Sequence, residues 1–341
     1  MRRQGEVKPT INDVARIAGV SKKTVSRVIN RSPLLNQATR KKVEAVIADI
    51  GYVPNLQARA LALRRNFLIG LIHDNPNAQM VLSFQESALA AMQGTEFALL
   101  VRPVNRHSPT LIEDLRAFLE QQRLYGVLIL PPLSENDAIP ALCRELGVNY
   151  VRMGSARLDD DTHLVESNDS QAVREAVQHL YQLGHRRIAL VTGPRGFRSA
   201  QEREAGYDEQ VAKLGLPADD ALKAGGNYTF DSGHEAGARL LDAVPRPTAI
   251  FSSNDEMAAG VLHAARERGI AVPEDLSIVG FDDTAIAAHL WPPLTTVRWP
   301  IVEMARAAAL KVIDPARAGE QPSFFESSLI RRASAGAAPR P

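Results

Sequence analysis

The chain has 341 residues, of which 45% are hydrophobic and 23% charged, and its formal net charge is +1. This composition is typical of a globular protein of about two or three domains, and the single cysteine excludes both a disulfide framework and a zinc finger built on cysteines. No secretory signal follows the basic N-terminal residues and no apolar run approaches the roughly 18–20 residues of a membrane span, so we expect a cytoplasmic protein.

The first 65 residues are strongly basic, although the whole chain is nearly neutral. They contain 14 Lys and Arg against 4 Asp and Glu, whereas the rest of the chain contains 26 against 35. A basic N-terminal part on an acidic remainder predicts a module that binds a polyanion, joined to a second module of different function.

The spacing of apolar residues predicts three short helices in this basic part, over residues 11–18, 22–30 and 37–50. Thr10, Ser21 and Asn36 precede these helices as N-caps, and Asp13 completes a capping box with Thr10. A short turn containing Gly19 separates the first two helices. Two helices joined in this way are typical of a helix-turn-helix DNA-binding unit.

After Arg65, short apolar runs alternate with helical stretches. The runs cover residues 68–72, 97–101, 127–130, 150–153, 188–192, 249–252 and 277–281, and the helices between them include 169–183 and 257–268. Buried strands separated by helices predict a doubly wound α/β architecture with parallel sheets. The length of this region indicates two such lobes. The small, Pro-rich and basic tail over 331–341 is expected to be disordered.

Several segments resemble the lactose/galactose repressor family in order along the chain. The segment TINDVARIAGVSKKTVSRVINRSPLLNQATRKKVEAVIADIGYVPN (10–55) resembles the DNA-binding head of that family. Five further segments resemble the regulatory core of that family, namely LGHRRIALVTGP (183–194), REAGY (203–207), AIFSSNDEMAAGVL (249–262), VPEDLSIVGFDD (272–283) and WPPLTTV (291–297). The resemblance covers residues 10–330 and implies a dimeric transcriptional repressor whose core is similar to periplasmic sugar-binding proteins.

This resemblance and the predicted elements together divide the chain into four parts. We expect a helix-turn-helix head over 1–53, a hinge helix or linker over 54–65, an effector-binding and dimerisation core over 66–330, and the tail. Within the core, an N-terminal lobe over 66–166 would be completed by a return segment over 295–325. The C-terminal lobe would cover 167–294.

In the head, the resemblance implies that Lys22, Lys23 and Arg27 of the second helix read base edges in the major groove. Hydroxyl and amide side chains are expected to contact phosphates, namely Thr10, Ser21, Thr24, Ser26, Asn30 and Thr39. The alternative is that Lys22 and Lys23 belong only to a solvated helix face.

The stretch PNLQARALAL (54–63) consists of good helix formers but is too short for a stable isolated helix. The resemblance implies that it folds as a hinge helix when two copies pair on DNA. Asn55, Ala58 and Leu61 would then contact the DNA, with Leu61 wedged between base pairs in the minor groove. A plain interdomain tether is the alternative interpretation.

Polar side chains follow several predicted strands, where the carboxyl ends of parallel strands form ligand clefts. The resemblance implies most strongly that Ser199, Arg203, Asn254 and Asp282 contact the effector. It implies the same less strongly for Asp169, Tyr228 and Trp299, and least strongly for Asp74, Phe84 and Arg106. Asp255 and Asp283, the second members of acidic or polar pairs, are expected instead to cap helices.

We therefore expect a homodimeric repressor of carbohydrate-utilisation genes, with no cofactor and no metal, whose affinity for operator DNA is controlled by a small sugar or glycoside. The absence of leucine heptads in the tail argues against tetramer formation. A purine- or corepressor-dependent regulator is an alternative, as is an architectural DNA binder without an effector. A sugar-modifying enzyme is disfavoured, because no phosphate-binding loop or nucleophile elbow occurs in the sequence.

Overall fold

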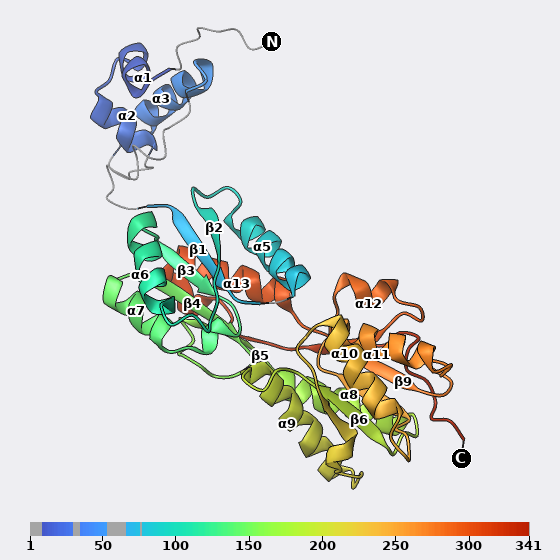
Figure 1. Ribbon diagram of the computed structural model, residues 1–341. Helices are drawn as coiled ribbons and strands as arrows, with labels where there is room; N and C mark the ends of the chain where they lie inside the picture. The colour runs from blue at the N-terminus through green and yellow to red at the C-terminus, as the bar shows by residue number, and fades with distance from the viewer. Residues whose placement is uncertain (1–8, 30–34, 53–65, 76, 341) are drawn as a thin grey trace. The chain divides into compact units, whose positions relative to one another are not determined.

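The computed structural model describes residues 9–29, 35–52, 66–75 and 77–340. The chain forms two compact units, Met1–Asn66 and Phe67–Pro341 (Figure 1). The predicted hinge helix over 54–65 lies outside the described residues. No helix in the described part of the chain is both long and apolar enough to cross a bilayer.

The first unit is a bundle of three helices, α1 (Ile11–Ala18), α2 (Lys22–Ile29) and α3 (Gln37–Asp49), which confirms the predicted helix-turn-helix. Its core is formed by small and β-branched side chains that are at least nine-tenths buried: Val14, Ala15, Ala18, Val25, Val28 and Val43. Gly19 ends α1 with φ 62°, a conformation that glycine adopts without strain. Ser21 Oγ then accepts a hydrogen bond from the Thr24 backbone amide at 3.1 Å and caps α2.

The second unit contains two six-stranded sheets, as the predicted fold class requires. The first has the strand order β11-β5-β4-β3-β1-β2 and is parallel throughout. Its strands are β1 (Leu68–His73), β2 (Ala98–Pro103), β3 (Gly126–Ile129), β4 (Asn149–Gly154), β5 (Leu164–Ser167) and β11 (Phe324–Phe325). The helices of this lobe are α5 (Ala78–Met92), α6 (Leu111–Gln122), α7 (Ala138–Leu146) and α13 (Ile301–Ile313), with a 3₁₀ turn η1 (Leu133–Glu135) and a further one, η3 (Pro315–Glu320), after α13.

The second sheet has the order β12-β10-β9-β8-β6-β7 and is parallel except for β12, which pairs antiparallel with β10. Its strands are β6 (Ile188–Thr192), β7 (Lys223–Gly225), β8 (Ala249–Ser252), β9 (Ser277–Asp282), β10 (Thr295–Arg298) and β12 (Ser328–Ile330). Its helices are α8 (Asp169–Gln182), α9 (Arg198–Lys213), α10 (Phe230–Leu241), α11 (Asp255–Glu267) and α12 (Ala285–His289), and η2 (Asp220–Leu222) precedes β7.

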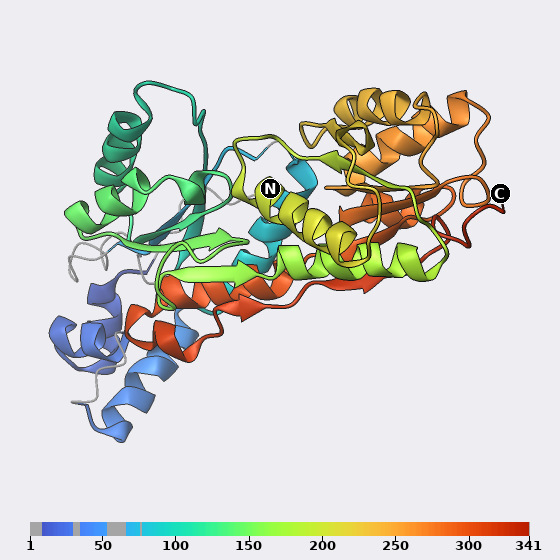
Figure 2. The same ribbon diagram turned by 90° about the horizontal axis from the view of Figure 1, so that it is seen from below.

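The chain crosses between the two lobes three times, after β5, after β10 and between β11 and β12 (Figures 1 and 2). This differs from the expected return segment over 295–325. Residues 295–298 form β10, which pairs with β9 and so belongs to the C-terminal lobe. The return to the N-terminal lobe consists of α13, which packs against α5, and β11, after which β12 goes back to the C-terminal lobe.

Residues 331–340 differ from the expected disordered tail, because they pack on the C-terminal lobe. Ser334 is 1% exposed; its hydroxyl donates to the Ile278 carbonyl at 2.6 Å and accepts from the Thr295 amide at 2.8 Å. The Ala338 amide donates to the Leu183 carbonyl at 2.8 Å. The backbone of β9 and β10 thus offers hydrogen-bond partners that the composition of the tail does not reveal.

Candidate functional site

Helix α2 presents a basic face on the first unit. Lys22, Lys23 and Arg27 are exposed, while Val25 and Val28 of the same helix are buried against α1 and α3. Because residues three and four apart share one face of a helix, the buried valines fix which side of α2 faces the solvent. The three predicted base-reading side chains therefore share the side that is free to enter a groove.

The hydroxyl groups expected at phosphates lie around the same helix-turn-helix. Thr10 donates to Asp13 Oδ2 at 2.8 Å, and this contact together with the Thr10 amide lowers the pKa of Asp13 to about 2. Ser21 and Thr24 Oγ atoms lie 2.9 Å apart at the start of α2. Ser26 and Thr39 are half-buried on α2 and α3. The other four predicted DNA contacts, Asn30, Asn55, Ala58 and Leu61, lie outside the described residues.

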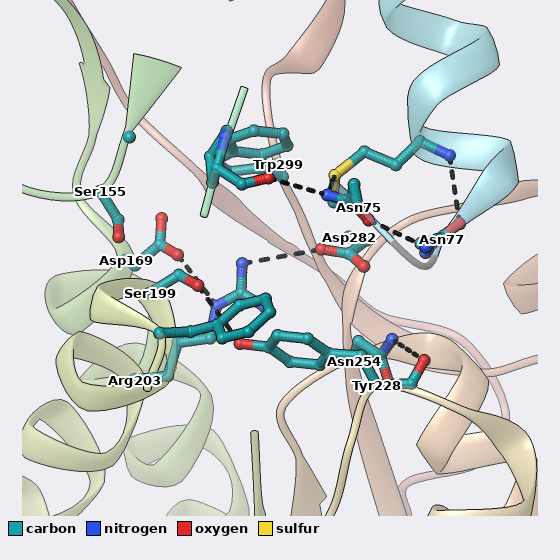
Figure 3. A pocket seen from close by; sticks show the side chains of 14 residues that line it. Asn75, Asn77, Ser155, Asp169, Ser199, Arg203, Tyr228, Asn254, Asp282 and Trp299 are labelled. Carbon is teal, nitrogen blue, oxygen red and sulfur yellow. Dashed lines mark hydrogen bonds and ion pairs between the residues drawn. The ribbon is translucent and has the colours of Figure 1, made fainter. Parts of the chain in front are cut away.

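A pocket lies at the carboxyl ends of strands from both lobes, with about 470 Å³ of empty space that includes open solvent (Figure 3). Seven of the ten predicted effector residues line it: Asp169, Ser199, Arg203, Tyr228, Asn254, Asp282 and Trp299. Its other lining residues are Asn75, Asn77, Met80, Pro131, Gly154, Ser155 and Phe197. The placement follows from the topology, since parallel strands bring their carboxyl ends to a common edge of each sheet.

Arg203 of α9 is the central charged group of this pocket and is 4% exposed. Its Nε donates to Asp169 Oδ2 at 2.9 Å, its Nη1 donates to the Ser253 carbonyl, and its Nη2 lies 3.7 Å from Asp282 Oδ1. The guanidinium also stacks on the Phe281 ring, 3.6 Å from the ring centroid. These contacts hold the guanidinium plane in one orientation at the floor of the pocket.

A chain of hydrogen bonds links this arginine to Trp299. Asp169 accepts a hydrogen bond from Ser167 Oγ at 2.6 Å, and the same Ser167 oxygen accepts from the Trp299 indole N–H at 2.8 Å. The indole N–H is therefore satisfied by the protein, which leaves the ring to offer an apolar surface to the pocket.

Asn254 and Tyr228 form the wall of the pocket that belongs to the C-terminal lobe. Asn254 caps α11 by accepting from the Met257 amide at 2.9 Å and donates to the Tyr228 carbonyl at 3.1 Å. Tyr228 and Asp282 have positive φ angles, 63° and 111°, in a region that costs energy for non-glycine residues. Gly193 admits the Tyr228 ring, because a Cβ there would lie 2.6 Å from it. Backbone strain of the kind seen at Tyr228 and Asp282 is concentrated at binding sites in proteins.

The wall that belongs to the N-terminal lobe contains residues that sequence reasoning did not assign. Asn75 donates to the Met80 sulfur at 3.2 Å, and Asn77 caps α5 by accepting from the Met80 amide at 3.1 Å. Asn77 Nδ2 and Ser155 Oγ are buried and have no hydrogen-bond partner among the described residues. Asn75 lies three residues after the predicted strand end at residue 72, so its position offered a signal; Asn77 and Ser155 offered none.

Burial sets the ionisation of the pocket. It raises the pKa of the Asp282 carboxyl well above its ordinary value, and Arg203 only partly offsets this effect. Burial opposes the charge on Arg203, but Asp169, Tyr228 and Asp282 outweigh it and raise the pKa of the guanidinium. The pocket therefore contains one arginine paired with Asp169, together with a second carboxyl, Asp282, whose pKa is raised by burial. Asp282 Oδ1 has no hydrogen-bond partner within the described structure.

Three predicted effector residues lie outside this pocket. Phe84 belongs to α5 and is 0% exposed in the hydrophobic core, so its assignment as a contact was wrong. Asp74 and Arg106 line an adjoining groove instead. Asp74 directly follows β1, and Arg106 lies in the segment after β2.

The expected capping roles of Asp255 and Asp283 were also wrong. Asn254, the residue before Asp255, caps α11, whereas Asp255 accepts from the Thr284 amide and Thr296 hydroxyl and supports the loop after β9. Burial raises the pKa of Asp255 to about 6. Asp283 instead pairs with Arg298 at 2.7 Å and Arg332 at 2.6 Å.

Two contacts cross the cleft beside the pocket and hold the lobes against each other. Glu135 of η1 accepts from the Arg198 backbone amide at the start of α9, at 2.9 and 3.0 Å. Arg106, which follows β2, lies 4.1 Å over the ring of Phe197, which precedes α9. The segment that leads into α9 therefore lines the effector pocket through Phe197 and also contacts the N-terminal lobe.

Two surface groups in the described structure place three possible metal ligands within reach of one another. They are His234, His263 and Glu267 on α10 and α11, and Asp159, Asp160 and His163 between β4 and β5. In each group one carboxylate already contacts a histidine: Glu267 lies 2.7 Å from His234, and Asp160 lies 3.1 Å from His163. None of the six residues lines the pocket.

Comparison with known proteins gives consistent matches along the chain. Residues 10–55 match the family described as bacterial regulatory proteins, lacI family, and residues 177–335 match a periplasmic binding protein-like domain. The HTH-type transcriptional regulator CelR of Thermobifida fusca is 35% identical over 319 residues, which cover 90% of this chain and 92% of CelR.

Two solved structures are also similar. A complex of the transcriptional regulator CelR with cellobiose has a TM-score of 0.67 at 34% identity and covers 96% of this chain and 100% of that chain. The lac repressor dimer bound to operator and the anti-inducer ONPF has a TM-score of 0.78 at 27% identity, with 97% and 100% covered.

Proposed function

Because this chain belongs to the lacI family of bacterial regulatory proteins and is a DNA-binding transcriptional regulator rather than an enzyme, we propose that a neutral carbohydrate bound between its lobes controls its affinity for operator DNA. The protein would act in the cytoplasm as a repressor of carbohydrate-utilisation genes. The similar CelR structure contains cellobiose, which supports a carbohydrate ligand for this chain.

The observation that carries the effector class is the mixture of groups around Arg203. Planar donors and acceptors suit the hydroxyl groups of a sugar, and the Trp299 and Phe197 rings suit its C–H face. The atoms Asn77 Nδ2, Ser155 Oγ and Asp282 Oδ1 have no hydrogen-bond partner among the described residues and could be satisfied by ligand hydroxyls. Because Arg203 is already neutralised by Asp169, the pocket favours a neutral ligand over an anionic one.

Control of DNA binding would come from the position of this ligand between the lobes. Its contacts are contributed by both sheets, so its affinity depends on how the lobes are oriented. Because linkage is reciprocal, the ligand changes the affinity for DNA by the same factor by which DNA changes the affinity for the ligand. The coupling free energy is typically about 1–3 kcal/mol.

The operator-bound form would be a homodimer, with two heads reading a roughly palindromic operator. The lac repressor structure is a dimer on its operator, which supports this assembly. Lys22, Lys23 and Arg27 would read bases, and Leu61 would wedge into the minor groove.

The test is a thermal-shift screen of the full chain with neutral mono- and oligosaccharides, followed by operator binding with each hit. We expect at least one sugar to raise the melting temperature and to change operator affinity by about 5- to 150-fold. Purine nucleosides and sugar phosphates serve as the comparison series. Stabilisation by these compounds alone would reject the neutral carbohydrate.

Effector binding is expected to depend on pH through Asp282. Its carboxyl has a raised pKa in the free protein, and hydroxyl groups that donate to it would favour its ionised form. Binding would then release a proton, and affinity would rise with pH up to the raised pKa. Calorimetry in buffers of different ionisation enthalpy measures this proton release, and Asp282→Asn should abolish it. Proton uptake in the wild-type protein would contradict the prediction.

A further inference from the structure

Helices α10 and α11 of the C-terminal lobe pack against each other with their backbones in close contact (Figure 1). Two glycines permit this approach. A Cβ at Gly233 would clash with the backbone of Met257, and a Cβ at Gly260 would clash with the Phe230 carbonyl oxygen. The close packing fixes the distance between the two helices, so side chains that meet across the pair have defined relative positions.

Two histidines and a glutamate meet across this helix pair at the protein surface. His234 of α10 is half-buried, whereas His263 and Glu267 of α11 are exposed. Because His263 and Glu267 are four residues apart, they share one face of α11. His234 Nε2 lies 2.7 Å from Glu267 Oε2, and His263 Nε2 lies 3.4 Å from Glu267 Oε1. The three candidate ligand atoms all lie within 4.8 Å of one another.

These separations are close to those between the ligands of a tetrahedral zinc ion. Bonds of about 2.0–2.2 Å from zinc to nitrogen and oxygen place neighbouring ligand atoms about 3.3–3.6 Å apart. The distance from His263 Nε2 to Glu267 Oε1 already has this value, and the hydrogen bond from His234 reaches it by small side-chain rotations. One histidine is enough to hydrogen-bond a carboxylate. The second Nε2 beside the same carboxylate is therefore the observation that points to a cation.

The charges around the three residues are compatible with a bound cation. The hydrogen bond from His234 is the largest of the effects that lower the pKa of Glu267, so this carboxylate is ionised at neutral pH. Arg268 opposes a second positive charge, since its Nη1 lies 4.0 Å from Glu267 Oε2. However, the same guanidinium donates to both carboxylate oxygens of Asp242 at 2.8 and 2.9 Å, which compensates its charge.

We propose that His234, His263 and Glu267 form a binding site for a divalent transition-metal ion of the Zn²⁺ class, which the sequence did not predict. Two imidazole nitrogens and a carboxylate oxygen suit such an ion, and three protein ligands leave one tetrahedral position for water. Because the ligands come from both helices, the bound ion ties α10 to α11 and stabilises the C-terminal lobe. The site shares no residue with the effector pocket, so this inference is independent of the proposed function.

The experiment measures zinc binding by the full-length, untagged protein after dialysis against a chelator. Isothermal titration calorimetry with ZnCl₂ should find one ion bound per chain, and the same ion should raise the midpoint of thermal unfolding. His234→Ala and His263→Ala should each weaken binding at least about 10-fold, the loss that even indirect partners of a metal ligand cause. Glu267→Gln should weaken binding as well. His289→Ala removes an exposed histidine of α12 and is the matched control, which should bind zinc as tightly as wild type.

A metal-free comparison separates loss of the site from loss of the fold. Without zinc, the three variants should unfold close to the midpoint of metal-free wild type, because substitutions at the surface change stability little. Only the rise in this midpoint that zinc causes should disappear.

Two results would overturn the site. If wild type bound no zinc and its unfolding midpoint did not rise, the three residues would form a hydrogen-bonded cluster only. If His234→Ala and His263→Ala bound zinc as tightly as wild type while His163→Ala did not, the ion would belong to the group of Asp159, Asp160 and His163 instead.

Discussion

Replacing Arg203 with alanine is expected to weaken binding of the effector at least about 100-fold, which corresponds to ~3 kcal/mol. The guanidinium is buried, bonded to Asp169 and the Ser253 carbonyl, and next to Asp282. Its removal takes away a planar donor set for sugar hydroxyls and leaves two buried carboxyl groups without their positive partner. Calorimetry with a sugar found in the screen measures the loss.

The same variant separates effector binding from DNA binding. Operator affinity without sugar should remain, because the head forms a compact unit of its own. The response of operator binding to sugar should disappear. Stability falls too, since a broken buried ion pair costs about 3–5 kcal/mol, so the binding experiments require temperatures well below the midpoint of unfolding.

Arg174→Ala is the matched control for this substitution. Arg174 pairs with Glu209 at 2.6 Å on the surface of the C-terminal lobe, away from the pocket. Exposed ion pairs contribute about 0–1 kcal/mol, so effector affinity should not change. An Arg203→Ala protein that remained folded and bound the sugar as tightly as wild type would remove Arg203 from the site.

The head was predictable because its signals are local. Thr10, Ser21 and Asn36 precede the three helices, and Gly19 lies at the turn that the helix-turn-helix requires. The valines that face inward recur at helical spacing, so local capping and burial agree with each other. Sequence pattern and tertiary packing rarely conflict in so small a bundle.

The core strands were predictable for a related reason, although shorter strands were missed. The seven predicted runs all form strands, with bounds within two residues of those expected. Five strands were not predicted, namely β5, β7, β10, β11 and β12, and each has only two to four residues. They exist because neighbouring strands offer hydrogen-bond partners, which is a property of the folded chain.

The two walls of the pocket differed in how well sequence located them. The C-terminal lobe contributes residues in regular strand–loop–helix units, and Arg203, Asn254 and Asp282, which the motifs indicated, all line the pocket. The segment after β1 has no such regularity: Asn75 and Asn77 line the pocket, whereas the neighbouring Asp74 and the aromatic Phe84 do not. An aromatic residue on an amphipathic helix looks the same in sequence whether it faces a ligand or the core.

The residue after a strand end is equally ambiguous without the fold. Aspartate is a residue type that often caps helices. Asp255 instead accepts a hydrogen bond from Thr296, and Asp283 pairs with Arg298, both more than ten residues away in the chain. Sequence places such carboxylates at the right edge of a sheet, and only tertiary contacts assign their partners.

On the DNA side, Arg27→Ala and Lys22→Ala are each expected to weaken binding to the specific operator about 5- to 150-fold, as for the loss of a base contact of about 1–3 kcal/mol. Both side chains are exposed on α2, while Val25 and Val28 of the same helix are buried. Lys41→Ala removes the same charge from an exposed position of α3 and controls for the general attraction of the basic head.

Fluorescence anisotropy on operator and on random duplex, over a range of salt concentrations, distinguishes the two effects. Substitution of a base-reading residue lowers operator affinity more than random-duplex affinity. Substitution of a residue that contacts phosphate weakens both alike and reduces the salt dependence. Equal losses on both duplexes would therefore assign these residues to the backbone, and base reading would have to come from other side chains.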